Sequence, residues 1–406
     1  MGELVSSPTV YDELDVPTVV NAAGTKTRIG GTLIRDEAVE AMAAAADSFV
    51  RISDLQARAS ERIAEVTGAE AGFVSSGAAA GLELAAAACI AGDDPAIMAG
   101  LPDTDGVASD VLMPRTHRTG YDHALRAAGA DIVDVGTNDR HLGTGATDVE
   151  PWELEAAIDE ETAAVALVQK DYSTPALRSV VDIAHRRDVP VIVDAAAELP
   201  PVGNLERFVD AGADLVVFSG GKAVRGPQST GIVAGRADLV GSIAAQQLDM
   251  HAEPSVWDPP DGLFAGIDVD GVPRQGLGRS LKVGKEELVG LLRALELFLE
   301  EDHEALEREW QARAESVESA LADVDGLTTS LATGGKAAAT EVVVDVDPDV
   351  TGRTAAGVVR TLRRETPRVF VAADDVEEGR FTVNPMCLDE TEAEYVVERI
   401  LAALDD

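Results

Sequence analysis

Lys222 follows a short apolar run in this 406-residue chain, where its amine could do covalent chemistry. The run, Leu215 to Phe218, is typical of a buried strand, and Ser219-Gly220-Gly221 then breaks it with a sharp turn. Only 6 of the 33 basic residues are lysines, which makes ordinary surface charge a poor explanation for this one. An amine with a lowered pKa at a strand end can form a Schiff base with an aldehyde cofactor. The alternative is a lysine that follows a turn and points into solvent.

Asp194 ends a second apolar run, Val191 to Val193. Open α/β sheets bind ligands at the carboxyl ends of their strands, so a carboxylate here is placed for a ligand. It could hold the protonated ring nitrogen of a pyridine cofactor and keep that ring an electron sink. The alternative is an aspartate that only caps the next helix.

Ser76, Gly77 and Ala78 form a turn between a predicted strand and an alanine-rich helix. Small residues at a helix amino end leave backbone N–H groups available for phosphate. His117 follows the next short strand, where an imidazole could stack on a flat cofactor. Many such turns and histidines are purely structural, and that alternative stays open for each of them.

Arginine suits a substrate carboxylate because its guanidinium binds carboxylates with two hydrogen bonds. Arg279 and Arg380 are the candidates, and a structural ion pair is the alternative for both. We find no dinucleotide-binding glycine motif, no Walker A loop and no zinc-protease motif. Cys89 and Cys387 lie in apolar surroundings and are expected to be buried thiols, so no metal site is predicted.

The elements that must position these residues alternate along the chain. Strands without polar alternation, separated by helices, predict an α/β fold with a mostly parallel central sheet covered on both faces. The strands expected in this region are 131–135, 163–169, 190–193 and 215–218. Residues 92–110 are rich in Asp, Pro and Gly and predict a loop.

Four regions are expected along the chain. One or two long amphipathic helices over residues 286–321 separate the α/β part from a small α+β carboxy-terminal domain. The predicted regions are an N-terminal arm and helix (1–50), a large cofactor-binding domain (51–280), linking helices (281–325) and the small domain (326–406).

The net charge of −40 counts against nucleic acid as the main partner. The sequence has no stripe of basic residues that could bind the phosphate backbone of a nucleic acid, so nucleic acid is not expected as a partner. Acidic residues spread over the whole chain are typical of a surface adapted to high salt. No apolar run approaches a membrane span and no secretory signal is evident, so a cytoplasmic protein without a membrane partner is expected.

Six stretches resemble the bacterial selenocysteine synthase-like pyridoxal-phosphate enzymes, and within them the D-glucosaminate-6-phosphate ammonia-lyase branch. The resemblance covers about residues 10 to 300 and is most specific around Lys222. The stretches are VVNAAGTKTRIGG (19–31), TGAEAGFVSSGAAAGL (67–82), HRTGYDHALR (117–126), VIVDAAAELPP (191–201), VVFSGGKAVRGPQSTG (216–231) and GRSLKVGKEE (278–287).

This resemblance implies a fold-type I pyridoxal 5′-phosphate enzyme that works as a homodimer or higher homo-oligomer. Lys222 would be the Schiff-base lysine and Asp194 the ring-nitrogen partner. Ser76, Gly77 and Ala78 would supply the phosphate cradle together with Ser219. The implied reaction is ammonia loss from an amino acid or 2-amino sugar acid, giving a 2-keto-3-deoxy acid. The alternatives are a seryl-tRNA selenium transferase-like activity or another amino-acid β-elimination.

Overall fold

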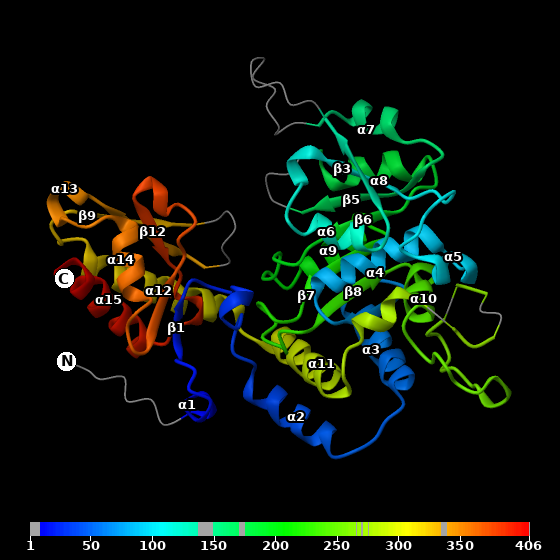
Figure 1. The fold of residues 1–406 in the computed structure, drawn as a ribbon, viewed down its shortest axis with the longest axis horizontal. Coiled ribbons are helices and arrows are strands. Elements are labelled where there is room, and N and C mark those ends of the chain that lie inside the picture. The colour runs from blue at the N-terminus through cyan, green and yellow to red at the C-terminus, as the bar shows by residue number, and fades with distance from the viewer. Residues whose placement is uncertain are drawn as a thin grey trace. The chain divides into compact units, whose positions relative to one another are not determined.

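The computed structural model of the chain describes residues 9–136, 149–169, 175–264, 266–268, 271–274, 276–333 and 339–405. It divides into two compact units (Figure 1). The larger unit runs from Ile34 to Glu300, and the smaller combines Met1–Leu33 with Glu301–Asp406. Of the two long helices, α11 (Lys285–Glu300) therefore belongs to the larger unit and α12 (His303–Leu321) to the smaller.

A seven-stranded sheet forms the centre of the larger unit, in the order β2-β8-β7-β6-β5-β3-β4. From β7 to β4 all neighbours are parallel, whereas β8 is antiparallel to both β2 and β7. The predicted mostly parallel central sheet is confirmed. Its strands are β2 (Ala71–Ser75), β3 (Asp110–Pro114), β4 (Asp131–Val135), β5 (Thr162–Val168), β6 (Val191–Asp194), β7 (Leu215–Ser219) and β8 (Gly231–Gly235).

Both faces of this sheet are buried, as the continuous apolar runs predict. Val217 faces α4 (Ala78–Ala91), because a Cβ placed on Gly81 of that helix would lie 2.8 Å from Val217 Cγ1. Phe218 faces the other side, where its ring lies 6.1 Å from that of Phe208 in α9 (Asn204–Asp210). Successive residues of β7 therefore pack into two separate cores.

The remaining elements of the larger unit include a short helix in the segment predicted as a loop. This helix, α5, begins at Pro95, and Asp94 Oδ1 caps it by accepting hydrogen bonds from the N–H groups of Ala96 (2.7 Å) and Ile97 (3.2 Å). The prediction of a loop over 92–110 is wrong there, because an Asp-Pro pair also starts helices.

The helical elements of the larger unit, besides α4, α9 and α11, are α2 (Asp36–Ala46), α3 (Ile52–Thr67), α5 (Pro95–Gly100), η2 (Arg115–His117), α6 (Asp122–Ala127), α7 (Pro151–Ala157), α8 (Leu177–His185), α10 (Ala237–Ala245), η3 (Pro254–Val256) and η4 (Leu277–Leu281).

The smaller unit is an α+β structure with its own apolar core. A three-stranded antiparallel sheet, β12-β10-β9, lies beside a parallel pair, β1-β11. No helix in the described residues is long and apolar enough to cross a membrane. The elements are α1 (Val10–Glu13), β1 (Val19–Ala22), η1 (Thr27–Ile29), β9 (Leu327–Ala332), β10 (Glu341–Val346), α13 (Pro348–Thr351), α14 (Ala355–Leu362), β11 (Arg368–Val371), η5 (Val376–Glu378), β12 (Arg380–Val383), η6 (Pro385–Cys387) and α15 (Glu390–Asp405).

Candidate active site

The residues predicted to hold the cofactor lie at the carboxyl ends of the strands of this sheet or directly after them. Asp194 is the last residue of β6 and Ser219 the last residue of β7, and these strands are parallel neighbours, with Asp194 paired in register with Val217. Lys222 lies in the turn that leaves β7 at this same edge. The fold therefore brings the lysine and the carboxylate to adjacent strand ends, where ligands bind in open α/β sheets.

The turn that carries Lys222 is tightly closed. The Gly226 N–H donates to the Gly220 carbonyl and the Arg225 N–H to the Lys222 carbonyl, both at 2.9 Å. A Cβ on Gly221 would lie 2.5 Å from the Gln228 Cα, so only glycine fits there. The Lys222 side chain is half-buried on a backbone that this turn holds in place.

Asp194 makes one local contact and also lines a pocket. Its Oδ1 accepts a hydrogen bond from the Ala196 N–H at 3.0 Å. The next helix along the chain is α9, so this hydrogen bond closes an Asx turn rather than capping a helix. Thr119 and Tyr121 line the same narrow pocket as Asp194, which places the segment after His117 beside the carboxylate.

The turn at Ser76, Gly77 and Ala78 begins α4 at this edge. Gly77 is the N-cap, with φ of 125°, and no side chain in the described part of the chain caps the helix. The first turn of α4 carries no acidic residue. The first strand residue of β8, Gly231, approaches so closely that a Cβ there would lie 2.5 Å from the Gly77 carbonyl carbon. This compact, glycine-lined helix start fits a phosphate group, because its N–H groups are available for an anion.

His117 is buried, at 5% exposure, and ends η2 directly after β3. Two arginines next to it bind carboxylates of the protein itself. Arg115 Nη2 lies 3.2 Å from Asp134, and Arg118 contacts both Asp134 and Asp122. The hydrogen bond with Asp122 raises the pKa of Arg118. These arginines therefore hold the β3–α6 segment together.

The two arginines predicted to bind a substrate carboxylate lie in different units. Arg279 is exposed in η4 of the larger unit, and its guanidinium forms no ion pair with any residue that the structure describes. Arg380 begins β12 of the smaller unit, where its Nε lies 3.2 Å from Asp345 Oδ1. A structural ion pair therefore accounts for Arg380, and its role toward a substrate stays a prediction.

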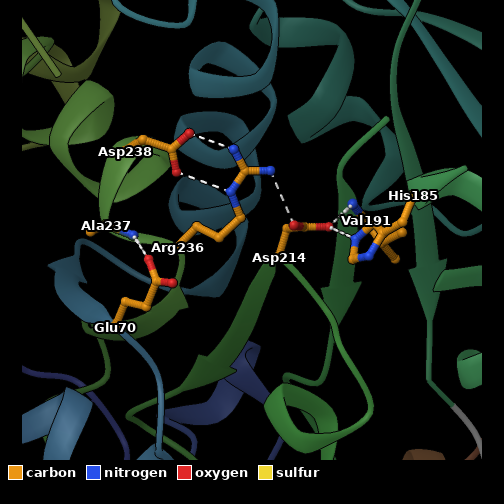
Figure 2. A network of polar contacts seen from close by, with 7 residues as sticks. All are labelled: Glu70, His185, Val191, Asp214, Arg236, Ala237 and Asp238. Carbon is orange, nitrogen blue, oxygen red and sulfur yellow. Dashed lines mark hydrogen bonds and ion pairs between the residues drawn. The ribbon is translucent and has the colours of Figure 1, made fainter. Parts of the chain in front are cut away.

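A second polar network, which the sequence analysis did not single out, lies at the opposite edge of the sheet. Figure 2 shows the buried Asp214 between His185 and Arg236. Its carboxylate contacts His185 Nε2 at 2.8 Å and Arg236 Nη1 at 3.2 Å, and it accepts a hydrogen bond from the Val191 N–H at 2.7 Å. Since Asp214 precedes β7 and Val191 begins β6, this network fixes the amino ends of the strands that carry the candidate site.

The surroundings of this network shift the pKa of two of its groups or neighbours. Hydrogen bonds with Asp238 and Asp214 raise the pKa of Arg236, which keeps its guanidinium charged. Burial raises the pKa of the nearby Cys89 thiol, which favours its neutral form. The sequence signal for the network was a polar residue, Asp214, directly before a buried apolar run.

Comparisons with known proteins agree with this geometry. The family model of L-seryl-tRNA selenium transferase (SelA) matches residues 19–252. D-glucosaminate-6-phosphate ammonia lyase of Salmonella typhimurium is 30% identical over 403 residues, which cover 97% of this chain and 97% of that protein. A 5′-C-glycyluridine monooxygenase-decarboxylase of a Streptomyces species is 31% identical, with coverage of 98% and 92%.

Solved structures extend the likeness to the fold. The structure of a D-glucosaminate-6-phosphate ammonia-lyase, 29% identical, superposes with a TM-score of 0.79 and covers 98% of this chain and 99% of that one. Pyridoxamine-pyruvate aminotransferase of Mesorhizobium loti, 15% identical, superposes with a TM-score of 0.54 over 96% and 92% of the two chains. The architecture is that of the fold-type I pyridoxal-phosphate enzymes, and the predicted fold class is confirmed.

Proposed function

The chain belongs to the L-seryl-tRNA selenium transferase family, and we propose that it is a pyridoxal-phosphate-dependent ammonia-lyase. Its substrate is a 2-amino sugar acid resembling D-glucosaminate 6-phosphate, and its products are a 2-keto-3-deoxy acid and ammonia. The observation that carries this proposal is the meeting of Lys222, Asp194 and the start of α4 at one edge of the sheet. The likeness over 97% of the chain to an ammonia lyase supports the choice of reaction.

The residues at this edge suit the cofactor of the family, pyridoxal 5′-phosphate. In our proposal the N–H groups around Ser76, Gly77 and Ala78 hold its phosphate together with Ser219, whose strand β7 is separated from β2 by β8. The buried His117 packs on the ring. When bound, the cofactor supplies an electron sink for the negative charge that develops at the substrate's α carbon.

Lys222 and Asp194 have separate tasks in this proposal. The Lys222 amine would hold the cofactor, and its Nζ would take the proton from the substrate's α carbon. Asp194 keeps a proton on the ring nitrogen, because its negative charge stabilises the charged form of that nitrogen. Arg279 binds the substrate carboxylate, since it is exposed and has no ion pair among the described residues.

Further parts of the proposal rest on composition and on the family. A net charge of −40 favours a small-molecule substrate over tRNA. We also propose that the protein is cytoplasmic, forms a homodimer or higher homo-oligomer, and is adapted to high salt.

Replacing Lys222 tests the assignment directly. Lys222→Ala should abolish the visible absorbance of the holoenzyme and reduce ammonia release from D-glucosaminate 6-phosphate about a thousandfold or more. Lys222→Arg is the matched control for charge, and it should fail equally because guanidinium cannot bond covalently to the cofactor. An unchanged spectrum and rate in Lys222→Ala would place the reactive amine elsewhere.

A substrate panel separates the proposed reaction from its alternatives. Ammonia and a 2-keto-3-deoxy acid should appear together from 2-amino sugar acids, without oxygen consumption. Activity on cysteine alone would indicate another β-elimination, and selenium transfer to seryl-tRNA would indicate a transferase. Oxygen uptake with carbon dioxide release would align the chain with its Streptomyces relative instead.

A further inference from the structure

The strand that leads into the proposed phosphate site, β2, is an edge strand of the seven-stranded sheet. Among the residues that the structure describes, β2 pairs only with β8, so its other side presents backbone N–H and C=O groups without a strand partner there. The strand ends at Ser75, and the Ser76-Gly77 turn that starts α4 follows at once. The placement of that turn therefore depends on how the outer side of β2 is held.

Gln56 of α3 pairs with the outer side of β2 next to this turn. Its Nε2 donates to the Val74 carbonyl at 2.8 Å, and its Oε1 accepts from the Val74 N–H at 3.1 Å. Both Gln56 and Val74 are fully buried, at 0% exposure. The side-chain amide thus replaces the backbone of a missing neighbouring strand, and water cannot take its place at the buried site.

Ser60, one turn further along α3, makes a similar contact near the start of β2. Its Oγ accepts a hydrogen bond from the Gly72 N–H at 3.0 Å. A Cβ on Gly72 would lie 2.3 Å from Ile63 Cγ2, which shows how closely the helix packs on the strand. Gln56 and Ser60 therefore stabilise the same edge, but only Gln56 binds the end that leads into the turn.

We propose that Gln56 is a positioning residue for the phosphate site at the start of α4. By fixing both backbone groups of Val74, it sets the position of the Ser76-Gly77 turn and so the direction of the N–H groups offered to an anion. This inference rests on the proposed function, which assigns that turn to the cofactor phosphate. Gln56 acts through the backbone and touches no reacting atom.

The test measures cofactor binding to the apoenzyme rather than activity. Fluorescence titration gives the dissociation constants of pyridoxal 5′-phosphate and of pyridoxal, which lacks the phosphate. Gln56→Leu replaces the amide with an apolar side chain of similar size, which cannot form hydrogen bonds with Val74. It should weaken binding of pyridoxal 5′-phosphate about tenfold or more while changing pyridoxal binding less than about threefold.

Ser60→Ala is the matched control on the same helix and strand. It should lower the unfolding midpoint of the apoenzyme, yet leave both dissociation constants within about threefold of the wild type. Equal weakening of both ligands in Gln56→Leu, or the same pattern in Ser60→Ala, would show a general structural role and overturn the proposal. Unchanged binding in Gln56→Leu would overturn it as well.

Gln56→Glu provides a second variant if Gln56→Leu does not fold. A protonated carboxyl can donate to and accept from Val74 as the amide does, whereas a carboxylate can only accept. Binding of pyridoxal 5′-phosphate, relative to the wild type at each pH, should weaken as pH rises and the carboxyl ionises. A ratio that does not change with pH would contradict the role of Gln56. Wild-type apoenzyme that binds pyridoxal as tightly as its phosphate would instead refute the phosphate site in the proposed function.

Discussion

Asp194 shows how one carboxylate satisfies a local turn and still lies at the candidate site. Its Oδ1 accepts the Ala196 N–H at 3.0 Å, and the same side chain lines a pocket with Tyr121. An asparagine can make the turn contact equally well, because its side-chain oxygen also accepts hydrogen bonds. Only the aspartate carries the negative charge that would keep a ring nitrogen protonated.

The two contributions of Asp194 can therefore be separated by substitution. Asp194→Asn should keep the unfolding midpoint close to that of the wild type but lower kcat about a hundredfold or more, since a charge interaction is lost in the reaction. Asp194→Ala should lose both the turn contact and the activity. Full activity in Asp194→Asn would reduce Asp194 to a turn residue.

Elements rather than single side chains shape the proposed phosphate site. β8 enters the sheet antiparallel to β7, so its first residue, Gly231, pairs with both Ser219 and Ser75. The backbone of β8 thereby lies against the start of α4, where a Cβ on Gly231 would come within 2.5 Å of Gly77. Strand and helix can approach so closely only because both contacting residues are glycines.

Gly231→Ala tests this close approach. The added methyl group must push strand and helix apart, so we expect a loss of about 1–3 kcal/mol in the free energy of unfolding. Binding of pyridoxal 5′-phosphate to the apoenzyme should weaken with it. Gly100→Ala at the end of α5 is the control, because a Cβ there meets nothing within 4 Å, and its stability should stay within about 0.5 kcal/mol of the wild type. Unaltered stability in Gly231→Ala would contradict the tight packing.

At the scale of the whole molecule, the most prominent feature is the excess of negative charge. The 73 acidic residues outnumber the 33 basic ones and give the net charge of −40. An ion pair such as that of Arg236 with the buried Asp214 offsets only the charges of the groups it joins, so such pairs cannot neutralise the excess. Repulsion among the remaining carboxylates opposes folding unless salt screens it.

Stability should therefore rise with salt concentration. Between about 0.1 M and about 1 M KCl the screening length falls from about 10 Å to about 3 Å, so repulsion across the surface is largely removed. We expect the thermal unfolding midpoint to increase by several degrees, measured by circular dichroism at constant pH. A midpoint that is unchanged or lower at high salt would show that the acidic surface does not limit stability, and the predicted adaptation to salt would be wrong.

The sequence by itself determined the features that depend on neighbouring residues. Apolar runs such as Leu215 to Phe218 predicted the parallel strands, because burial on both faces removes polar alternation. The residue types at the ends of those runs, Asp194 and Lys222, identified the candidate site. The motifs around them resembled the family to which the chain belongs.

Only the tertiary structure decided which segments are neighbours. β8 was not predicted as a strand, and its antiparallel position between β2 and β7 depends on pairing between residues distant in the chain. The contacts of Gln56 with Val74 and of His185 with Asp214 join residues 18 and 29 positions apart. The sequence around a buried polar residue does not reveal its role, because its partner is a backbone group or a charge that only folding brings close to it.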